Sequence, residues 1–247
     1  MLSLLPEGLS VIAFWAIMVA SFAGSFITVA FGIGGGGLLL AILASLVPPA
    51  ALIPIHGVVQ TGSNAGRMLM LWREIFWPAL PWFALGTVIG VTVGGAVAVE
   101  LPPQFVQIGV GAFVIYTVMA RAPRWFSRWP LFTGIISSFL TMFFGATGLF
   151  VASFTKSHTL PRHAHVATHA TLMTVQHGLK VVVFGLLGFA YGEWIWVIGM
   201  MIAVGLIGTY AGRLVLNRLT DARFGVVLNM LLVLISLRLI WQGVSTL

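Results

Sequence analysis

The chain has no cysteine and very little charge. Without thiolates it can form no disulfide, no iron–sulfur cluster and no zinc–thiolate site. Only 7% of its 247 residues are charged, whereas a soluble domain carries about 25%. The polar side chains are therefore too few to cover a water-exposed globule, which excludes a soluble enzyme.

What the chain has instead is apolar sequence, because 60% of its residues are hydrophobic. Apolar stretches near the length of a membrane helix, about 20 residues, recur along the whole chain. We predict an all-α polytopic membrane protein, a single transmembrane domain over residues 1–247. The expected apolar segments cover residues 9–46, 50–71, 77–98, 103–120, 129–154, 164–188, 193–213 and 222–242.

Two glycine-rich breaks divide the chain into related halves. Residues 32–37 (GIGGGG) interrupt the first apolar segment and residues 145–148 (GATG) interrupt the fifth, and neither stretch can hold a regular helix. We predict two repeats of four helical segments, residues 9–121 and 129–242. Residues of the two halves match at a spacing of 113 residues (from Phe31 to Phe144), including Gly35 with Gly148, Pro48 with Pro161, His56 with His169, Thr61 with Thr174, and Arg67 with Lys180.

The charges of the loops indicate how the two halves are oriented in the membrane. If every apolar segment crossed the membrane, the last basic loop would fall opposite the basic loop between the repeats, against the positive-inside tendency. If the glycine-broken segments are re-entrant hairpins, all the basic loops share the cytoplasmic side. We prefer such inverted repeats, with the broken helices meeting near the bilayer midplane, over eight complete spans with one charge violation. The basic loops hold Arg67 and Arg73, then Arg121, Arg124 and Arg128, then Lys156 and Arg162, then Arg213, Arg218 and Arg223, while two acidic loops hold Glu100 and Glu193.

Two predicted helices carry stripes of polar side chains, and their other faces are apolar. An Arg or Lys at mid-membrane costs roughly 2.5–3.5 kcal/mol on insertion scales, so it normally faces a cavity or a partner. No acid lies within either helix, so a basic surface between the repeats fits an anionic substrate. Helical spacing places His56, Gln60, Ser63 and Arg67 on one stripe, and Arg162, His165, His169, Gln176 and Lys180 on the other.

Each glycine-rich break leaves a short half-helix, which starts near Gly37 or near Gly148. The free N–H groups and the positive dipole end of such a helix attract an oxyanion. We therefore predict one substrate site built from both breaks and both polar helices. Its predicted residues are Gly35, Gly36, Gly37, His56, Gln60, Ser63, Asn64, Arg67, Thr147, Gly148, His169, Gln176, His177 and Lys180.

Each of these features also has a purely structural interpretation. The glycines can serve close helix packing alone, Arg67 and Lys180 can extend to the membrane interface, and the histidines can be ordinary core or loop groups. His165 and His169 have metal-ligand spacing, but no HExxH motif or carboxylate accompanies them. We therefore predict no metal, no cofactor and no catalytic residue.

The expected partners are a small anion and the lipid bilayer. The basic residues are scattered between helices, so they give no nucleic-acid signal. The oligomeric state cannot be read from the sequence, because small residues such as Gly90 and Gly94 can pack within one protomer or between protomers.

The order of these features resembles the TauE/SafE family of membrane transporters. Each glycine-rich break is followed by an apolar stretch, a proline (Pro48 or Pro161) and a polar helix, and a later glycine-rich helix runs into Leu101-Pro102-Pro103. The resemblance covers nearly the whole chain, although the second polar helix is unusually rich in histidine. It implies a multi-pass protein of the cell inner (plasma) membrane that exports sulfite or a short organosulfonate such as sulfoacetate by alternating access.

Several other functions stay open at this point. Direction cannot be read from the sequence, so import of sulfate or thiosulfate is an alternative, and the histidines allow a proton-coupled carrier. An anion channel and a histidine-based membrane enzyme are less favoured alternatives.

Overall fold

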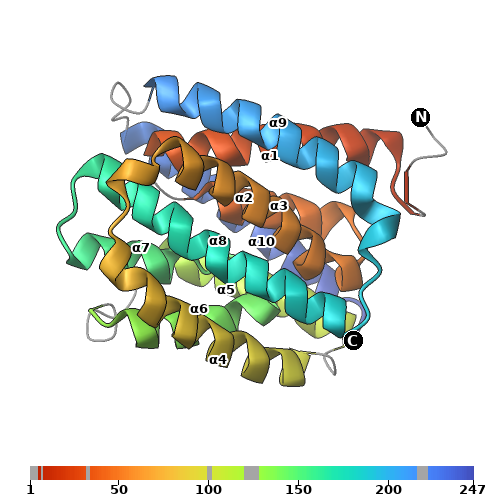
Figure 1. The fold of residues 1–247 in the computed structure, drawn as a ribbon. Helices are drawn as coiled ribbons and strands as arrows, with labels where there is room; N and C mark the ends of the chain where they lie inside the picture. Colours follow the sequence, from red (N-terminus) through yellow and green to blue (C-terminus); the bar gives the residue numbers. More distant parts are fainter. Residues whose placement is uncertain (1–4, 7, 32–33, 99–101, 120–127, 216–221) are drawn as a thin grey trace.

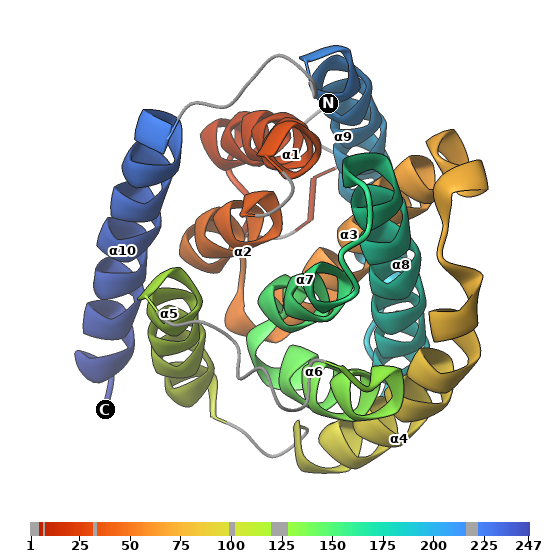
Figure 2. The same ribbon diagram turned by 90° about the vertical axis from the view of Figure 1, so that its left-hand side faces the viewer.

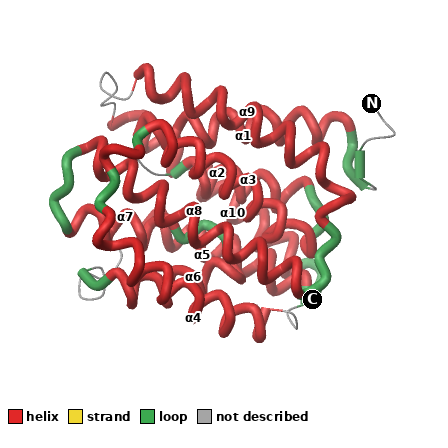
Figure 3. The backbone as a smooth tube through the Cα atoms, viewed as in Figure 1, coloured by secondary structure: helices red, strands yellow, loops and turns green. Residues whose placement is uncertain are grey.

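The computed structural model describes residues 5–6, 8–31, 34–98, 102–119, 128–215 and 222–247, and in this part of the chain it contains helices and no strand (Figures 1 and 3). The predicted all-α fold of a polytopic membrane protein is confirmed. The α-helices are α1 (Val11–Phe31), α2 (Gly35–Leu46), α3 (Pro49–Met70), α4 (Leu80–Ala98), α5 (Pro103–Met119), α6 (Pro130–Phe144), α7 (Gly148–Ser157), α8 (Arg162–Leu186), α9 (Ile195–Val215) and α10 (Ala222–Val244). The described connections also contain the 3-10 turns η2 (Trp72–Glu74) and η3 (Trp77–Ala79), between α3 and α4, and η4 (Tyr191–Trp194), between α8 and α9.

Some sequence predictions fall outside the described residues. They concern the first two residues of the first glycine-rich break and several loop charges. These residues are Gly32, Ile33, Glu100, Leu101, Arg121, Arg124 and Arg218.

The outer surface of the bundle is apolar. The helical stretches Val11–Ala30, Trp77–Val97 and Tyr191–Val215 are each long and apolar enough to cross a membrane. Their large exposed side chains need a lipid environment, because water would not solvate so broad an apolar surface. Examples on the outer helices are Ile12, Trp15, Val19, Leu85, Ile89, Ile207, Leu214, Leu234 and Trp241.

Both glycine-rich segments break the chain into a longer and a shorter helix. Gly34 ends the first break with a φ of 107°, and Gly145 begins the second with a φ of 71°. Both angles lie in the left-handed region that side chains disfavour, so glycine suits each turn. The short helices α2 and α7 then begin at Gly35 and Gly148, and the first of these starts two residues before the expected position.

The longer helices surround the two short ones (Figure 2). The predicted repeats would make α1 equivalent to α6, α2 to α7, α3 to α8, α4 to α9 and α5 to α10. The most extensive helix contacts are α4 with α6, α1 with α9, α5 with α10 and α3 with α8. The helices α3 and α5 each pack on their own equivalents, α8 and α10. The pairs α1 with α9 and α6 with α4 are equivalent to each other. An internal two-fold axis would produce both patterns. Insertion of the halves in opposite directions stays a prediction.

Glycines allow α4 and α6 to pack closely against each other within one protomer. A Cβ added at Gly90 would meet the backbone of Ile135, and one added at Gly94 would lie 2.8 Å from Cγ of Met142. These two glycines therefore serve packing within the protomer, the first of the two roles that the sequence leaves open.

We expect Gly134→Ala to destabilise this contact. Its Cβ would lie 2.5 Å from the carbonyl oxygen of Phe83 and 3.1 Å from the backbone nitrogen of Thr87. Because backbone cannot move aside cheaply, the free energy of unfolding should fall by about 1–3 kcal/mol. Thermal unfolding in detergent measures this, with Gly199→Ala as the control, since its added Cβ meets nothing within 4 Å. Equal melting temperatures for the two variants would contradict the close α4–α6 contact.

Candidate functional site

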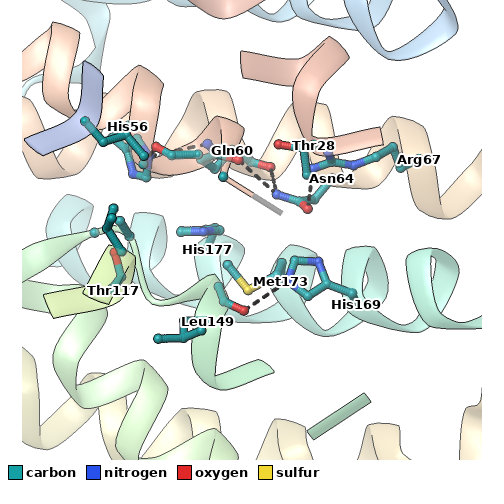
Figure 4. A pocket seen from close by; sticks show the side chains of 18 of the residues that line it. Thr28, His56, Gln60, Asn64, Arg67, Thr117, Leu149, His169, Met173 and His177 are labelled. Carbon is teal, nitrogen blue, oxygen red and sulfur yellow. Dashed lines mark hydrogen bonds between the residues drawn. The ribbon is translucent and has the colours of Figure 1, made fainter. Parts of the chain in front are cut away.

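A cavity of about 270 Å³ lies between the polar helices α3 and α8, at the point where α2 and α7 begin (Figure 4). The structure brings together here many of the residues that the sequence singles out. The predicted residues that line it are Gly36, Gly37, His56, Gln60, Asn64, Arg67, Gly148, His169 and His177.

The polar helices α3 and α8 both line the cavity and run antiparallel to each other. A Cβ added at Gly57 would lie 2.7 Å from Cε of Lys180, and the rings of His56 and His177 are 5.6 Å apart between centroids. The other end of the cavity holds Arg67 and His169 (Figure 4). Each end therefore combines side chains of both repeats, and the antiparallel pair is the arrangement that inverted repeats would produce.

A histidine from each polar helix anchors the start of the neighbouring short helix. Nε2 of His56 lies 3.1 Å from the Gly36 carbonyl oxygen, and Nε2 of His169 lies 3.2 Å from the Gly148 carbonyl oxygen. A carbonyl oxygen can only accept, so Nε2 carries the proton in both rings. The Nδ1 atom of His56 is buried without a hydrogen-bond partner in the described structure.

Arg67 ends a chain of hydrogen bonds along α3. Nδ2 of Asn64 donates to the backbone oxygen of Gln60 at 2.7 Å and to its Oε1 at 3.2 Å. Nη2 of Arg67 donates to Oδ1 of Asn64 at 2.6 Å. These bonds hold the guanidinium in place, yet its Nε and Nη1 are buried without a hydrogen-bond partner among the described residues. Two nitrogens of this cation are thus left without a partner in a residue that lines the cavity.

Lys180, the repeat equivalent of Arg67, lies outside the cavity lining. Its side chain is fully buried, with an exposed fraction of 0%, and packs against Gly57. The described residues supply no hydrogen-bond partner for its Nζ. Arg67 is 3% exposed, so neither cation extends to the surface of the bundle. The cavity is therefore bordered by two buried cations, one at its wall and one behind it.

Five predicted site residues, Lys180 among them, do not line the cavity. Ser63 exchanges a 2.9 Å hydrogen bond with Ser25 on α1. Gln176 donates to Oγ1 of Thr147 at 2.6 Å and accepts from Oγ of Ser137 at 2.8 Å, which ties α8 to the start of α7. Gly35 packs against α1.

The cavity lining also contains residues that sequence reasoning missed. Lys156, predicted in a loop, lies in the last turn of the short helix α7 and reaches the cavity. Thr117 and Asn229 come from α5 and α10, two mainly apolar helices in which a polar side chain was the available signal. The remaining additions are Thr28, Gly34, Val118, Gly145, Ala146, Leu149, Met173 and Leu232.

The lining is rich in nitrogen donors and poor in acids. Within the described part of the chain, no group of three or more histidine or acidic side chains is placed to hold a metal ion. Arg67 and Lys156 supply positive charge, and the first N–H groups of α2 and α7 have no acceptor within their own helices. This combination can bind an anion with several oxygens.

Comparison with known proteins agrees with this chemistry. The model of the family described as "Sulfite exporter TauE/SafE" matches residues 16–239, nearly the whole chain. No curated protein matches the chain, and no solved structure does. The apolar outer helices and the family match together make this a membrane transporter. The chain belongs to the sulfite exporter TauE/SafE family.

Proposed function

We propose that the protein exports a small sulfur oxyanion, sulfite or a short organosulfonate such as sulfoacetate, across the cell inner (plasma) membrane. The cavity between α3 and α8 is the central site. The observation that carries this proposal is Arg67, whose guanidinium lines the cavity and keeps two buried nitrogens without a partner among the described residues. A buried cation of this kind is costly until an anion binds it.

The bound anion would accept the hydrogen bonds for which Arg67 has no acceptor among the described residues. Nε and Nη1 of Arg67 have no partner among the described residues, and an oxyanion would accept charge-assisted hydrogen bonds from the guanidinium. The backbone N–H groups at the starts of α2 and α7 add neutral donors, and the glycines there allow an anion to approach closely. The site then opens alternately to each side of the membrane.

Export needs no coupling ion. Outward movement of an anion from an inside-negative cell is favourable by roughly 2.3 kcal/mol per charge per 100 mV. The central cavity contains no Asp or Glu that could relay protons among the described residues that line it. A uniporter is therefore sufficient.

A ligand screen followed by a flux measurement tests the function. Purified protein is heated with sulfite, sulfoacetate, taurine, sulfate or thiosulfate, and the ligand that raises the melting temperature most is loaded into liposomes. We expect sulfite or sulfoacetate to stabilise the protein and to leave the liposomes at a rate that saturates with concentration and increases with an inside-negative potential. A stronger response to sulfate or thiosulfate, or a rate that never saturates, would contradict the proposed exporter.

Lys180→Met should weaken substrate binding less than replacement of Arg67, which lines the cavity. Lys180 acts on the anion through its charge alone, because it lies behind the lining beside Gly57. At an effective dielectric constant near 20, a nearby charge contributes on the order of 1–2 kcal/mol, which is about tenfold in affinity. Titration calorimetry with sulfite measures the change. The control Arg128→Gln removes an exposed positive charge and should leave affinity unchanged; equal losses in the two variants would refute a local role for Lys180.

A further inference from the structure

A second groove, of about 410 Å³, lies at one end of the bundle, where α3 ends, α8 begins and α9 ends. Among the described residues, none lines both this groove and the central cavity. Its lining residues are Met70, Leu71, Trp72, Arg73, Glu74, His163 and Arg213. The proposed transport function makes no use of them.

Charges of both signs meet in this groove. Arg73 and Arg213 are exposed cations, and Glu74 is an exposed acid. Cζ of Arg73 lies 5.6 Å from the centroid of the Trp72 ring, which places the guanidinium over an aromatic face. Two cations beside one carboxylate complement a ligand that carries a phosphate and an ammonium group.

The surroundings of the groove favour a lipid over a soluble molecule. Trp72 is 56% exposed at the end of α3, where tryptophan marks the membrane–water interface. Next to the charged groups, Leu69, Tyr210 and Leu214 are each more than half exposed. An acyl chain would cover these apolar side chains while the headgroup occupies the groove.

Helix packing places these apolar residues on one strip of surface. A Cβ added at Gly62 would lie 2.8 Å from Ile202, and one added at Gly66 would meet Leu206. The two contacts advance by the same number of residues on each helix, so α3 and α9 run side by side in the same direction. Leu69 therefore lies near Tyr210, and Arg73 near Arg213, with which it shares the groove.

We propose that this groove binds the headgroup of an amine-bearing phospholipid such as phosphatidylethanolamine. The guanidinium groups of Arg73 and Arg213 bind the phosphodiester, and the carboxylate of Glu74 accepts hydrogen bonds from the ammonium. The choline headgroup cannot make the second contact, because its quaternary nitrogen carries no hydrogen. The lipid would join α3, α8 and α9, helices from both repeats.

Native mass spectrometry of the detergent-purified protein tests the site. We expect the wild type to retain one phosphatidylethanolamine molecule at least about tenfold better than phosphatidylcholine, since charge-assisted hydrogen bonds are the strong ones. The R73Q/R213Q variant should lose this lipid, while R128Q, an exposed arginine outside the groove, should keep it. The E74Q variant should retain the phosphodiester contact but lose the preference for ethanolamine over glycerol headgroups.

Several results would overturn the proposal. Equal retention by the wild type and R73Q/R213Q would remove the groove as the binding site, as would equal loss in R128Q. Equal retention of phosphatidylcholine would remove the role of Glu74. Inorganic phosphate or glycerophosphoethanolamine displacing the lipid at equal concentration would identify a soluble ligand. If the double variant fails to fold, E74Q and the lipid comparison still decide the question, and neither depends on sulfite transport.

Discussion

Arg67→Met is expected to abolish sulfite binding and flux while leaving the folded protein intact. The guanidinium has two buried donors without a partner among the described residues, and each charge-assisted hydrogen bond to an anion contributes about 1.5–3 kcal/mol. Losing two such bonds should lower affinity at least about 100-fold. Calorimetric titration and liposome flux measure this loss.

The stability of the same variant separates a binding role from a structural one. A buried cation without an ionic partner carries a desolvation penalty, which an apolar side chain of similar size removes. We therefore expect an unchanged or higher melting temperature without substrate. Arg67→Lys should give an intermediate affinity, because it keeps the charge but loses the separate guanidinium donors. If Arg67→Met unfolds earlier and still binds sulfite normally, the guanidinium supports the fold and the site lies elsewhere.

Gly35→Ala is expected to destabilise the protein more than any other single methyl group added at the first break. Its Cβ would clash with the carbonyl oxygen of Gly24 and with Oγ1 of Thr28, so α1 and α2 would have to separate. In the opposite direction, a Cβ at Gly24 would lie 2.7 Å from the Gly35 carbonyl oxygen. Overpacking against backbone typically costs about 1–3 kcal/mol of stability, and here the contact involves the backbone of both α1 and α2. Thermal unfolding in detergent measures the effect.

Gly37→Ala is the matched control, two residues further along the same helix. An added Cβ there meets nothing within 4 Å, and alanine favours a helix over glycine by about 0.8–1 kcal/mol. We expect this variant to melt at the same temperature as the wild type or higher. If the two variants melt alike, the contact between α1 and α2 at Gly35 is not close.

The glycine-rich break illustrates how far sequence reasoning reaches. The sequence supports two uses for its glycines, close helix packing and approach of an anion, and it predicts Gly35, Gly36 and Gly37 in the substrate site. In the structure the first use belongs to Gly35, which touches α1, whereas Gly36 and Gly37 line the cavity. Helical periodicity identifies faces of a single helix, but which face meets a neighbour depends on how helices cross.

The same limit explains the position of Lys180. Repeat matching pairs it with Arg67 and predicts both in the substrate site. In the fold, Arg67 lines the cavity, whereas Lys180 packs against Gly57 and does not line it. Sequence matching predicts equivalent positions in the chain, whereas burial depends on small neighbours in the other repeat. The helices, both breaks and nine of the cavity-lining residues were predictable because each has a local signature.

The two histidine bonds restrict how the cavity can open. His56 holds α3 to the start of α2, and His169 holds α8 to the start of α7, each within its own repeat. A motion that keeps these bonds must carry each short helix along with its polar helix as one piece. The boundary between α3 and α8 separates these two pieces, and Gly57 and Gly178 lie on it without side chains of their own. In the proposed transporter, access to either side of the membrane would then change by shifting α2 and α3 against α7 and α8, with the anion between them.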